Sequence, residues 1–348
     1  MTTKEVKEML EQQLTIDEDV SQWLMKPGSV DSFVKLPGDA STRQYFRMSF
    51  GNESRIVMKM EAFRDRADKL PFLIIQEHLA SVGIPVPAVY DVDPDNGLIV
   101  LEDLGDMTLL RKLQEVSNAD VERHLYEQVI NSLVELQVKA SPGGARAVEL
   151  DAFKLRFDRE KLMWEMGFTI EHFYELHLKR TLRTADRKII MDGLEEICGF
   201  LAGLPTVLAH RDFHSRNIMV LEPERFVMID FQDARMGPAV YDLASLLRDS
   251  YYQLEEAQIS RLLDYYVARW EALSGQPVNR DEFRYAFDMM SVQRNFKAIG
   301  SFASFLNRRG NPTYLKYIGN TFENIRRTLL KYPQYSRLRE TLFHYYYF

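Results

Sequence analysis

Cysteine is almost absent from this chain of 348 residues, since Cys198 is the only one. A single thiol excludes an internal disulfide framework and a zinc site built from several cysteines, and it indicates a reducing compartment. Long apolar runs are also missing. The longest weakly polar stretch, residues 199–209, is shorter than the ~18 residues of a membrane span and is interrupted by Pro205. We therefore expect no membrane partner.

Positive charge is in short supply: 44 Lys and Arg oppose 51 Asp and Glu, which gives a net charge of −7. General nucleic-acid binding needs clustered cations, so we expect no nucleic-acid partner. Residues 1–14 have a helical pattern without the apolar core of an export signal. Together with the lone cysteine, this pattern predicts a cytoplasmic protein, and we expect it to act as a monomer.

The chain has enough apolar residues, 46%, for a large core, and at ~150 residues per domain its length suggests about two lobes. The pattern changes near Gly105. Before Gly105, short runs of alternating residues bounded by turns predict five strands, at 32–36, 44–50, 55–60, 89–92 and 97–101. The same part of the chain contains one predicted helix, at 70–82, which Gly83 ends. After Gly105, helices at 121–139, 154–177, 183–201 and from 240 onward surround a strand-rich island at 207–230. We predict an α+β, bilobal fold, with a small β-rich lobe at 1–104 and a larger, mostly helical lobe at 105–348.

The strand-rich island holds the residues best suited to chemistry. His210 and Asp212 are followed five positions later by Asn217, and Asp230 comes thirteen positions after Asn217 on a hydrophobic strand. Phosphoryl transfer gives these residues roles. Asp212 can orient a substrate hydroxyl and accept its proton, while Asn217 and Asp230 offer the oxygen ligands that Mg²⁺ prefers. The alternative is an ordinary polar hairpin.

At these positions the chain resembles the aminoglycoside-phosphotransferase-like family, relatives of protein kinases that phosphorylate small molecules. His210, Asp212 and Asn217 match the family's catalytic loop, and Asp230 matches its metal-binding Asp. Asp242 matches the Asp of its Gly-x-x-x-x-Asp-Leu-Ala helix start, which would brace the loop by hydrogen bonds. The resemblance covers almost the whole chain. It implies a protein-kinase-like fold with ATP as donor and Mg²⁺ as cofactor.

Two further side chains lie inside the same loop. We predict that Arg216 takes part in catalysis through the phosphate and that His214 contacts the substrate. Each is equally compatible with a purely structural place in the loop.

The small lobe is expected to bind the nucleotide. Ser41 and Thr42 would donate hydrogen bonds to phosphate oxygens, although their loop is neither a G-x-G-x-x-G nor a Walker A pattern and a plain hairpin turn is the alternative. Lys59 would anchor the phosphates and Glu77 would hold Lys59, as in kinases, unless both are simply solvated.

The hinge is expected at residues 101–105. The resemblance implies that backbone groups there read the adenine edge, which places Glu102 and Leu104 at the nucleotide.

A finer resemblance is to a bacterial branch of this family, the anomeric kinases of N-acetylmuramate and N-acetylglucosamine. Four blocks carry it: residues 38–47, 210–217, 229–234 and 293–303. The branch transfers the γ-phosphate of ATP to a sugar C1 hydroxyl in peptidoglycan recycling. The alternatives are a kinase of an aminoglycoside, choline or another sugar, and a nucleotide-binding regulator without turnover.

Besides His214, four further residues are predicted to contact the sugar acceptor. Arg294 and Lys297 share one helix face and would suit the lactyl carboxylate of N-acetylmuramate, unless they are ordinary exposed cations. Trp164 would stack on a sugar ring or else belong to the core, and Glu165 lies beside it in the helical insert where this fold places its acceptor.

Overall fold

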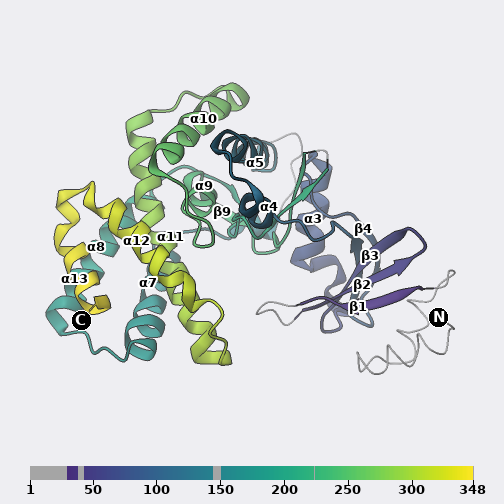
Figure 1. Ribbon diagram of the computed structural model, residues 1–348, viewed down its shortest axis with the longest axis horizontal. Helices are drawn as coiled ribbons and strands as arrows, with labels where there is room; N and C mark the ends of the chain where they lie inside the picture. The colour runs from purple at the N-terminus through teal and green to yellow at the C-terminus, as the bar shows by residue number, and fades with distance from the viewer. Residues whose placement is uncertain (1–29, 38–42, 144–149, 223, 348) are drawn as a thin grey trace. The chain divides into compact units, whose positions relative to one another are not determined.

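The computed structural model describes residues 30–37, 43–143, 150–222 and 224–347 (Figure 1). The predictions for the helix at 1–14 and for Ser41 and Thr42 lie outside these residues. The chain divides into two compact units. Unit 1 comprises the residues up to Ile74 and Val86–Asp106, and unit 2 comprises Ile75–Pro85 and the chain from Met107 onward. The predicted α+β class is confirmed, because unit 1 is built on a sheet and unit 2 mainly on helices.

Unit 1 contains an antiparallel sheet in the strand order β1-β2-β3-β5-β4. Its strands are β1 (Ser32–Lys35), β2 (Gln44–Phe50), β3 (Glu53–Lys59), β4 (Val89–Asp93) and β5 (Leu98–Glu102). The apolar sides of β1, β2, β3 and β5 form a core around Phe33 and Phe46, whose rings stack with centroids 5.1 Å apart. A 3-10 turn (Arg64–Lys69) follows β3. The alternation seen in the sequence therefore marks the buried face of this sheet.

Unit 2 is organised around one long helix, α11 (Arg280–Arg309), which packs on α7, α9 and α12. The helices are α3 (Pro71–Ser81, which begins in unit 1), α4 (Leu109–Glu115), α5 (Ala119–Lys139), α6 (Asp151–Lys154), α7 (Arg159–Thr169), a π-helix (Ile170–His177), α8 (Thr184–Ala202), α9 (Val240–Leu247), α10 (Glu256–Ser274), α11, α12 (Ile318–Leu330) and α13 (Ser336–Tyr347). Asn279 caps the start of α11 by accepting hydrogen bonds from Asp281 N and Glu282 N. Gly300 lies so close to Thr169 of α7 that a side chain there would clash, which explains a small residue at this crossing.

Two small sheets lie within unit 2. One pairs β6 (Thr206–Ala209) with β9 (Arg235–Pro238), and the other pairs β7 (Ile218–Leu221) with β8 (Arg225–Met228). The segment from β6 to β7 contains the predicted catalytic loop. Both its ends are therefore fixed by strand pairing.

The prediction of one continuous helix at 154–177 is wrong. The chain leaves the helical conformation at Leu155, because the N–H of Met236 on β9 donates to Leu155 O (2.9 Å) and the N–H of Phe157 donates to Met236 O (2.9 Å). Asp158 then caps α7 by accepting from Lys161 N (2.7 Å). A contact with a distant strand overrides the local helical pattern here.

The aromatic C-terminal segment packs on the helices of unit 2. Tyr346 stacks on Phe322 with ring centroids 4.3 Å apart, and Tyr345 Oη donates to Asp186 (2.7 Å). None of the helices in the described part of the chain has both the length and the apolar character that crossing a membrane requires.

Candidate active site

The start of the catalytic loop is held by a buried carboxylate. Asp242, which is fully buried in α9, accepts hydrogen bonds from the backbone N–H groups of His210 (2.6 Å) and Arg211 (2.9 Å). This confirms the bracing role predicted for Asp242. Arg211 has a φ of +82°, a left-handed conformation that these two hydrogen bonds support. Burial raises the pKa of Asp242 to about 7, although the two N–H groups oppose that shift.

The middle of the loop is held by a second buried carboxylate that the sequence analysis missed. Asp249 Oδ2 accepts from both the N–H (3.0 Å) and the hydroxyl (2.5 Å) of Ser215, and Asp249 Oδ1 accepts from Tyr251 N (2.9 Å). Asp249 comes two residues after the end of α9, outside the helical pattern that carries Asp242, so helical spacing gave no signal for it. Burial raises the pKa of Asp249 as well.

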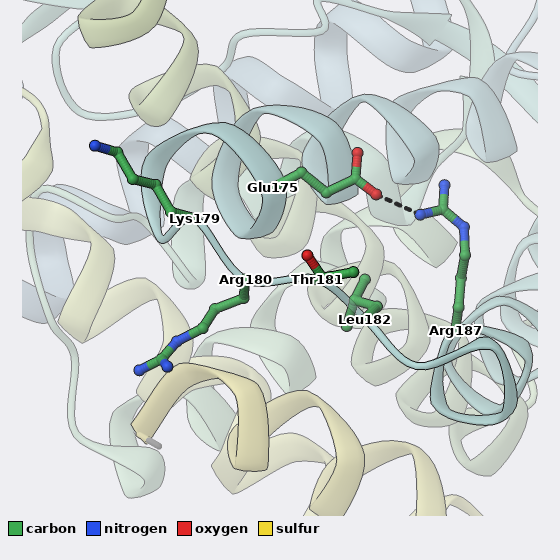
Figure 2. A pocket seen from close by; sticks show the side chains of 6 residues that line it. All are labelled: Glu175, Lys179, Arg180, Thr181, Leu182 and Arg187. Atoms are coloured by element: carbon green, nitrogen blue, oxygen red, sulfur yellow. Dashed lines mark hydrogen bonds and ion pairs between the residues drawn. The ribbon is translucent and has the colours of Figure 1, made fainter.

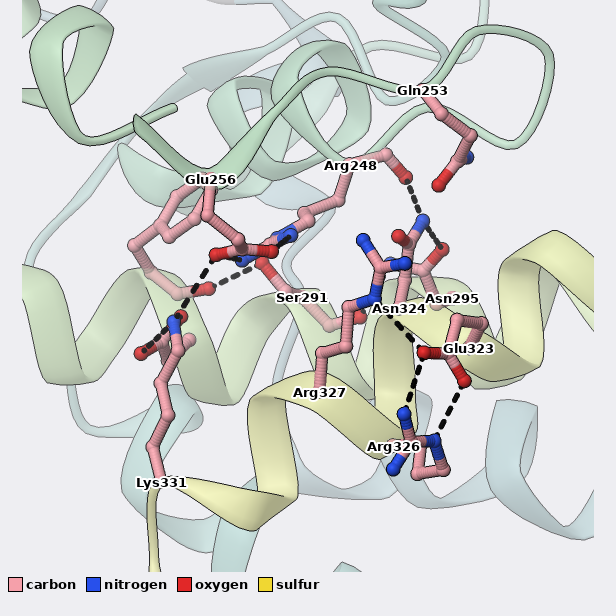
Figure 3. A network of polar contacts seen from close by, with 12 residues as sticks. Arg248, Gln253, Glu256, Ser291, Asn295, Glu323, Asn324, Arg326, Arg327 and Lys331 are labelled. Atoms are coloured by element: carbon pink, nitrogen blue, oxygen red, sulfur yellow. Dashed lines mark hydrogen bonds and ion pairs between the residues drawn. The ribbon is translucent and has the colours of Figure 1, made fainter. Parts of the chain in front are cut away.

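Polar contacts of Arg248, which precedes Asp249 in sequence and directly follows α9, join this segment to its neighbours (Figure 3). The Arg248 guanidinium donates to both carboxylate oxygens of Glu256 at the start of α10 (2.5 and 2.9 Å). The carbonyl of Arg248 accepts from Asn324 of α12 (3.4 Å), and Asn324 also donates to Asn295 of α11 (3.4 Å). The support of the catalytic loop is thus continuous with three long helices.

Asp212 forms ion pairs with two cationic side chains of α11. Its Oδ1 is 3.2 Å from Arg294 Nη2 and 3.7 Å from Lys297 Nζ. Burial by itself would raise the pKa of Asp212, but the charges of Lys297, Arg294 and Arg211 outweigh it and hold that pKa well below its usual range. The structure therefore brings two residues predicted for the acceptor onto the residue predicted as the base.

The two loop histidines are kept neutral by burial. Burial lowers the pKa of His210, and it lowers the pKa of His214 to about 3. His210 Nδ1 accepts from Asp212 N (3.4 Å), which links the histidine to the loop backbone. Arg216 lies against two tyrosines, with its guanidinium 4.9 Å from the Tyr251 ring centre and 5.6 Å from that of Tyr314. These rings fix the direction of the arginine.

The predicted metal ligands stand at one end of the β7–β8 hairpin. Asn217 directly precedes β7, Asp230 comes two residues after the end of β8, and the N–H of Ile229 donates to Asn217 O (3.0 Å). Asn217 Nδ2 donates to Asp212 O (3.0 Å), which leaves the amide oxygen as the side chain's remaining acceptor. Asp230 is exposed and has a φ of +66°. This donor set fits Mg²⁺, which takes few protein ligands when phosphates supply the rest.

The residues predicted for the nucleotide fall in both units. Lys59 is the last residue of β3 in unit 1, and Glu77 lies on the part of α3 that belongs to unit 2, so their pairing stays a prediction. Glu102 Oε2 accepts from Ala88 N (3.2 Å) beside β4, and Leu104 is buried. Both flank the chain segment expected to read adenine through its backbone.

Trp164 and Glu165 differ in environment although they are adjacent. Trp164 is 58% exposed and carries Lys161 Nζ 3.9 Å from its ring centre, so it is not a core residue. Glu165 is only 2% exposed, and its Oε2 accepts from Gln293 of α11 (2.9 Å). Trp164 is thus accessible to a ligand, whereas Glu165 faces the helix that carries Arg294 and Lys297.

A separate depression of about 470 Å³ lies where the π-helix gives way to α8 (Figure 2). It is lined by Glu175, Lys179, Arg180, Thr181, Leu182 and Arg187. Arg187 is paired with Glu175 (2.5 Å), and none of the residues predicted for catalysis lines it. It is a basic surface feature distinct from the catalytic loop.

A β-rich unit, a helical unit and a braced loop between two small sheets define the fold of protein-kinase-like phosphotransferases. Residues 32–276 match the phosphotransferase enzyme family, and the chain belongs to that family. It is therefore a small-molecule kinase that uses a nucleotide.

Relatives and solved structures agree with this membership. The N-acetylmuramate/N-acetylglucosamine kinase of Neisseria meningitidis serogroup B is 35% identical over 304 residues, which cover 86% of each chain. The kinase of the same name from Pseudomonas aeruginosa is 32% identical over 315 residues, 89% of this chain and 87% of that protein. The ADP-bound aminoglycoside phosphotransferase APH(2'')-Ib has a TM-score of 0.59 at 17% identity, over 89% of this chain and 98% of that one. Choline kinase LicA from Streptococcus pneumoniae has a TM-score of 0.58 at 14% identity, over 92% and 98%. The predicted kinase-like fold is confirmed.

Proposed function

We propose that this protein transfers the γ-phosphate of ATP to the anomeric C1 hydroxyl of N-acetylmuramate and N-acetylglucosamine, in the cytoplasmic recycling of cell-wall sugars. The observation that carries the proposal is Asp212, an ionised carboxylate at the centre of a loop braced by Asp242 and Asp249. The names of the relatives support the choice of sugar.

The state of Asp212 bears on the kind of hydroxyl it serves. A carboxylate with a lowered pKa is a weak base, so it is best matched to a hydroxyl that loses its proton readily. An anomeric hydroxyl is more acidic than an ordinary alcohol. Positioning of the two reactants would supply most of the rate enhancement, with Asp212 accepting the proton as the new O–P bond forms.

In this proposal Asn217 and Asp230 hold Mg²⁺, which neutralises the charge of the phosphates. Arg216, fixed between its two tyrosines, contacts the transferred phosphate, while His210 and His214 shape the loop as neutral groups. Trp164 offers an exposed ring to the sugar.

Unit 1 supplies the nucleotide site. Ser41, Thr42 and Lys59 would hold the phosphates. The pairing of Glu77 with Lys59 stays a prediction, because Glu77 belongs to unit 2. The backbone from Glu102 to Leu104 reads the base.

The test is a panel of acceptors offered to the purified protein with ATP and Mg²⁺. The panel contains N-acetylmuramate, N-acetylglucosamine, choline and an aminoglycoside, and phosphorus NMR identifies the product. We expect an anomeric sugar phosphate from the first two. Turnover of choline or the aminoglycoside alone would reassign the acceptor, and ATP binding without acceptor-dependent ADP release would make the protein a regulator.

A further inference from the structure

Arg294 and Lys297 are arranged around a single oxygen atom. Both contact Asp212 Oδ1, at 3.2 and 3.7 Å, and they approach it from consecutive turns of α11. Arg294 is itself held in place, because its Nε donates to Ser245 Oγ of α9 (2.8 Å). The side chains of the two cations are only 10% and 14% exposed, against 26% for Asp212. The pair is therefore a fixed support under the carboxylate, with Asp212 as the member that reaches solvent.

The charges around these cations are already balanced by the protein. Lys297 faces Arg294 on its own helix, Asp212 and Arg211 from the loop, and Glu165 from α7. Arg211 in turn pairs with Asp233 (3.1 Å). The two cations therefore offer little exposed surface to a carboxylate on the acceptor, and such a carboxylate would compete with Asp212 for them.

Lys297 is also sensitive to pH in the range where kinases are assayed. Burial and the neighbouring Arg294 lower its pKa to about 8, although Asp212 and Glu165 act in the opposite direction. Above that pH the lysine loses its charge and with it the attraction to Asp212.

We propose that Arg294 and Lys297 are positioning residues, which hold Asp212 by Oδ1 so that Oδ2 accepts the proton of the acceptor, and that they do not read a carboxylate on the sugar. The inference rests on the proposed function. In the step concerned, the O–H bond of the acceptor breaks and its proton passes to Asp212 Oδ2. The acceptor oxygen forms the new bond to the γ-phosphorus, and the bond from that phosphorus to the β-phosphate oxygen breaks to release ADP.

Two acceptors with the same ring separate the alternatives, because N-acetylmuramate carries a lactyl carboxylate and N-acetylglucosamine is neutral. We expect Lys297→Met to lower kcat by the same factor, about tenfold or more, for both sugars, with little change in either KM. Lys297→Arg should keep kcat near the wild-type value and move to higher pH the decline that we expect for the wild type above about pH 8. The matched control is Arg284→Met, on the same helix but paired with Asp264 (2.7 Å), which should leave kinetics unchanged.

A loss of kcat/KM confined to N-acetylmuramate would overturn the inference and restore the carboxylate-reading role. A second measurement needs no substrate: a double-mutant cycle of Asp212→Asn and Lys297→Met, followed by urea unfolding. We expect the shifts in unfolding midpoint to be non-additive, and strict additivity would contradict the contact. If the wild type phosphorylates neither sugar, the proposed function fails, while this cycle still decides whether Lys297 supports Asp212.

Discussion

The two units each contain a cluster of three charges, with the signs exchanged. In unit 2 one anion, Asp212, meets the cations Arg294 and Lys297. In unit 1 one cation, Arg47 of β2, meets the anions Asp103 and Asp106, which follow β5.

In the unit 1 cluster all three guanidinium nitrogens of Arg47 donate hydrogen bonds. Arg47 binds Asp103 through two hydrogen bonds of 2.7 and 2.9 Å and reaches Asp106 through two more of 3.0 and 3.1 Å. Hydrogen bonds to Asp106 and Asp103 raise the pKa of Arg47, so it stays charged. The contacts to Asp212 are longer, and both fall on one of its oxygens. A complete set of partners indicates a structural clamp, whereas an incomplete set leaves an atom for chemistry.

The largest effect is expected for substitution of Asp212, the anion of the unit 2 cluster. Asp212→Asn keeps the shape but not the basicity, so we expect kcat to fall by roughly 10²-fold or more, measured by ADP release. Calorimetry should find ATP affinity retained. Unchanged turnover would show that Asp212 is not the base.

The second-largest effect is expected for substitution of Asp242, which holds the start of the catalytic loop. Each carboxylate oxygen of Asp242 accepts from one buried N–H group, and Asp242→Asn turns one of these two acceptors into a donor, so the free energy of unfolding should fall by about 1–3 kcal/mol. Because the folded protein binds a proton at Asp242 up to about pH 7, the contribution of this group to stability should decline as pH rises from about 4 to 7. Urea titrations of both proteins across this range should find that the stability of the wild type falls relative to that of the variant as pH rises.

Substitution in the complete cluster should affect stability and nucleotide binding. Arg47→Gln removes the clamp that fixes residues 103–106, so we expect a loss of about 1–2 kcal/mol in unfolding free energy and a higher KM for ATP. The KM for the sugar should not change. An effect on kcat alone would indicate that Arg47 takes part in phosphate transfer, and it would contradict the purely structural role assigned to the unit 1 cluster.

The smallest effect is expected at a cluster with the same signs as that of Asp212 but with side chains that are 31–46% exposed. Glu323 of α12 accepts from Arg326 (2.7 Å) and Arg327 (2.9 Å), which lower its pKa to about 2 (Figure 3). Glu323→Gln should cost about 0.5 kcal/mol or less, since solvent screens such pairs. The wild type should lose this contribution only as pH falls from about 4.5 to 2. Differential scanning calorimetry with Glu323→Gln as reference would detect it, and a loss comparable to that of Asp242→Asn would contradict the role assigned to burial.

Local sequence patterns predicted the secondary structure correctly wherever the residues that determine an element are neighbours in sequence. The alternation at 44–50 matches β2, and Gly83, with a φ of +78°, ends α3 as expected. The strand β9 was missed because Gly237 and Pro238 are poor strand formers, and it exists through pairing with β6.

The residues of the candidate active site also divide into those that a local sequence pattern predicts and those that it does not. The loop from His210 to Asn217 could be predicted because its spacing is local. The contact of Arg294 with Asp212 joins residues 82 apart, so no spacing could indicate it. Trp164 shows a different limit, because helical periodicity does not reveal whether a neighbouring element covers a given face; the structure leaves it 58% exposed.

The left-handed backbone of Asp230 has a consequence for directed evolution. Glycine adopts such a conformation without steric penalty and asparagine adopts it readily, so either would relieve strain that the aspartate carries. A library selected only for survival of heating should therefore enrich the substitutions Asp230→Gly and Asp230→Asn, and both remove the carboxylate that we propose as a ligand of Mg²⁺. Heat resistance and phosphate transfer would be in competition at this one position.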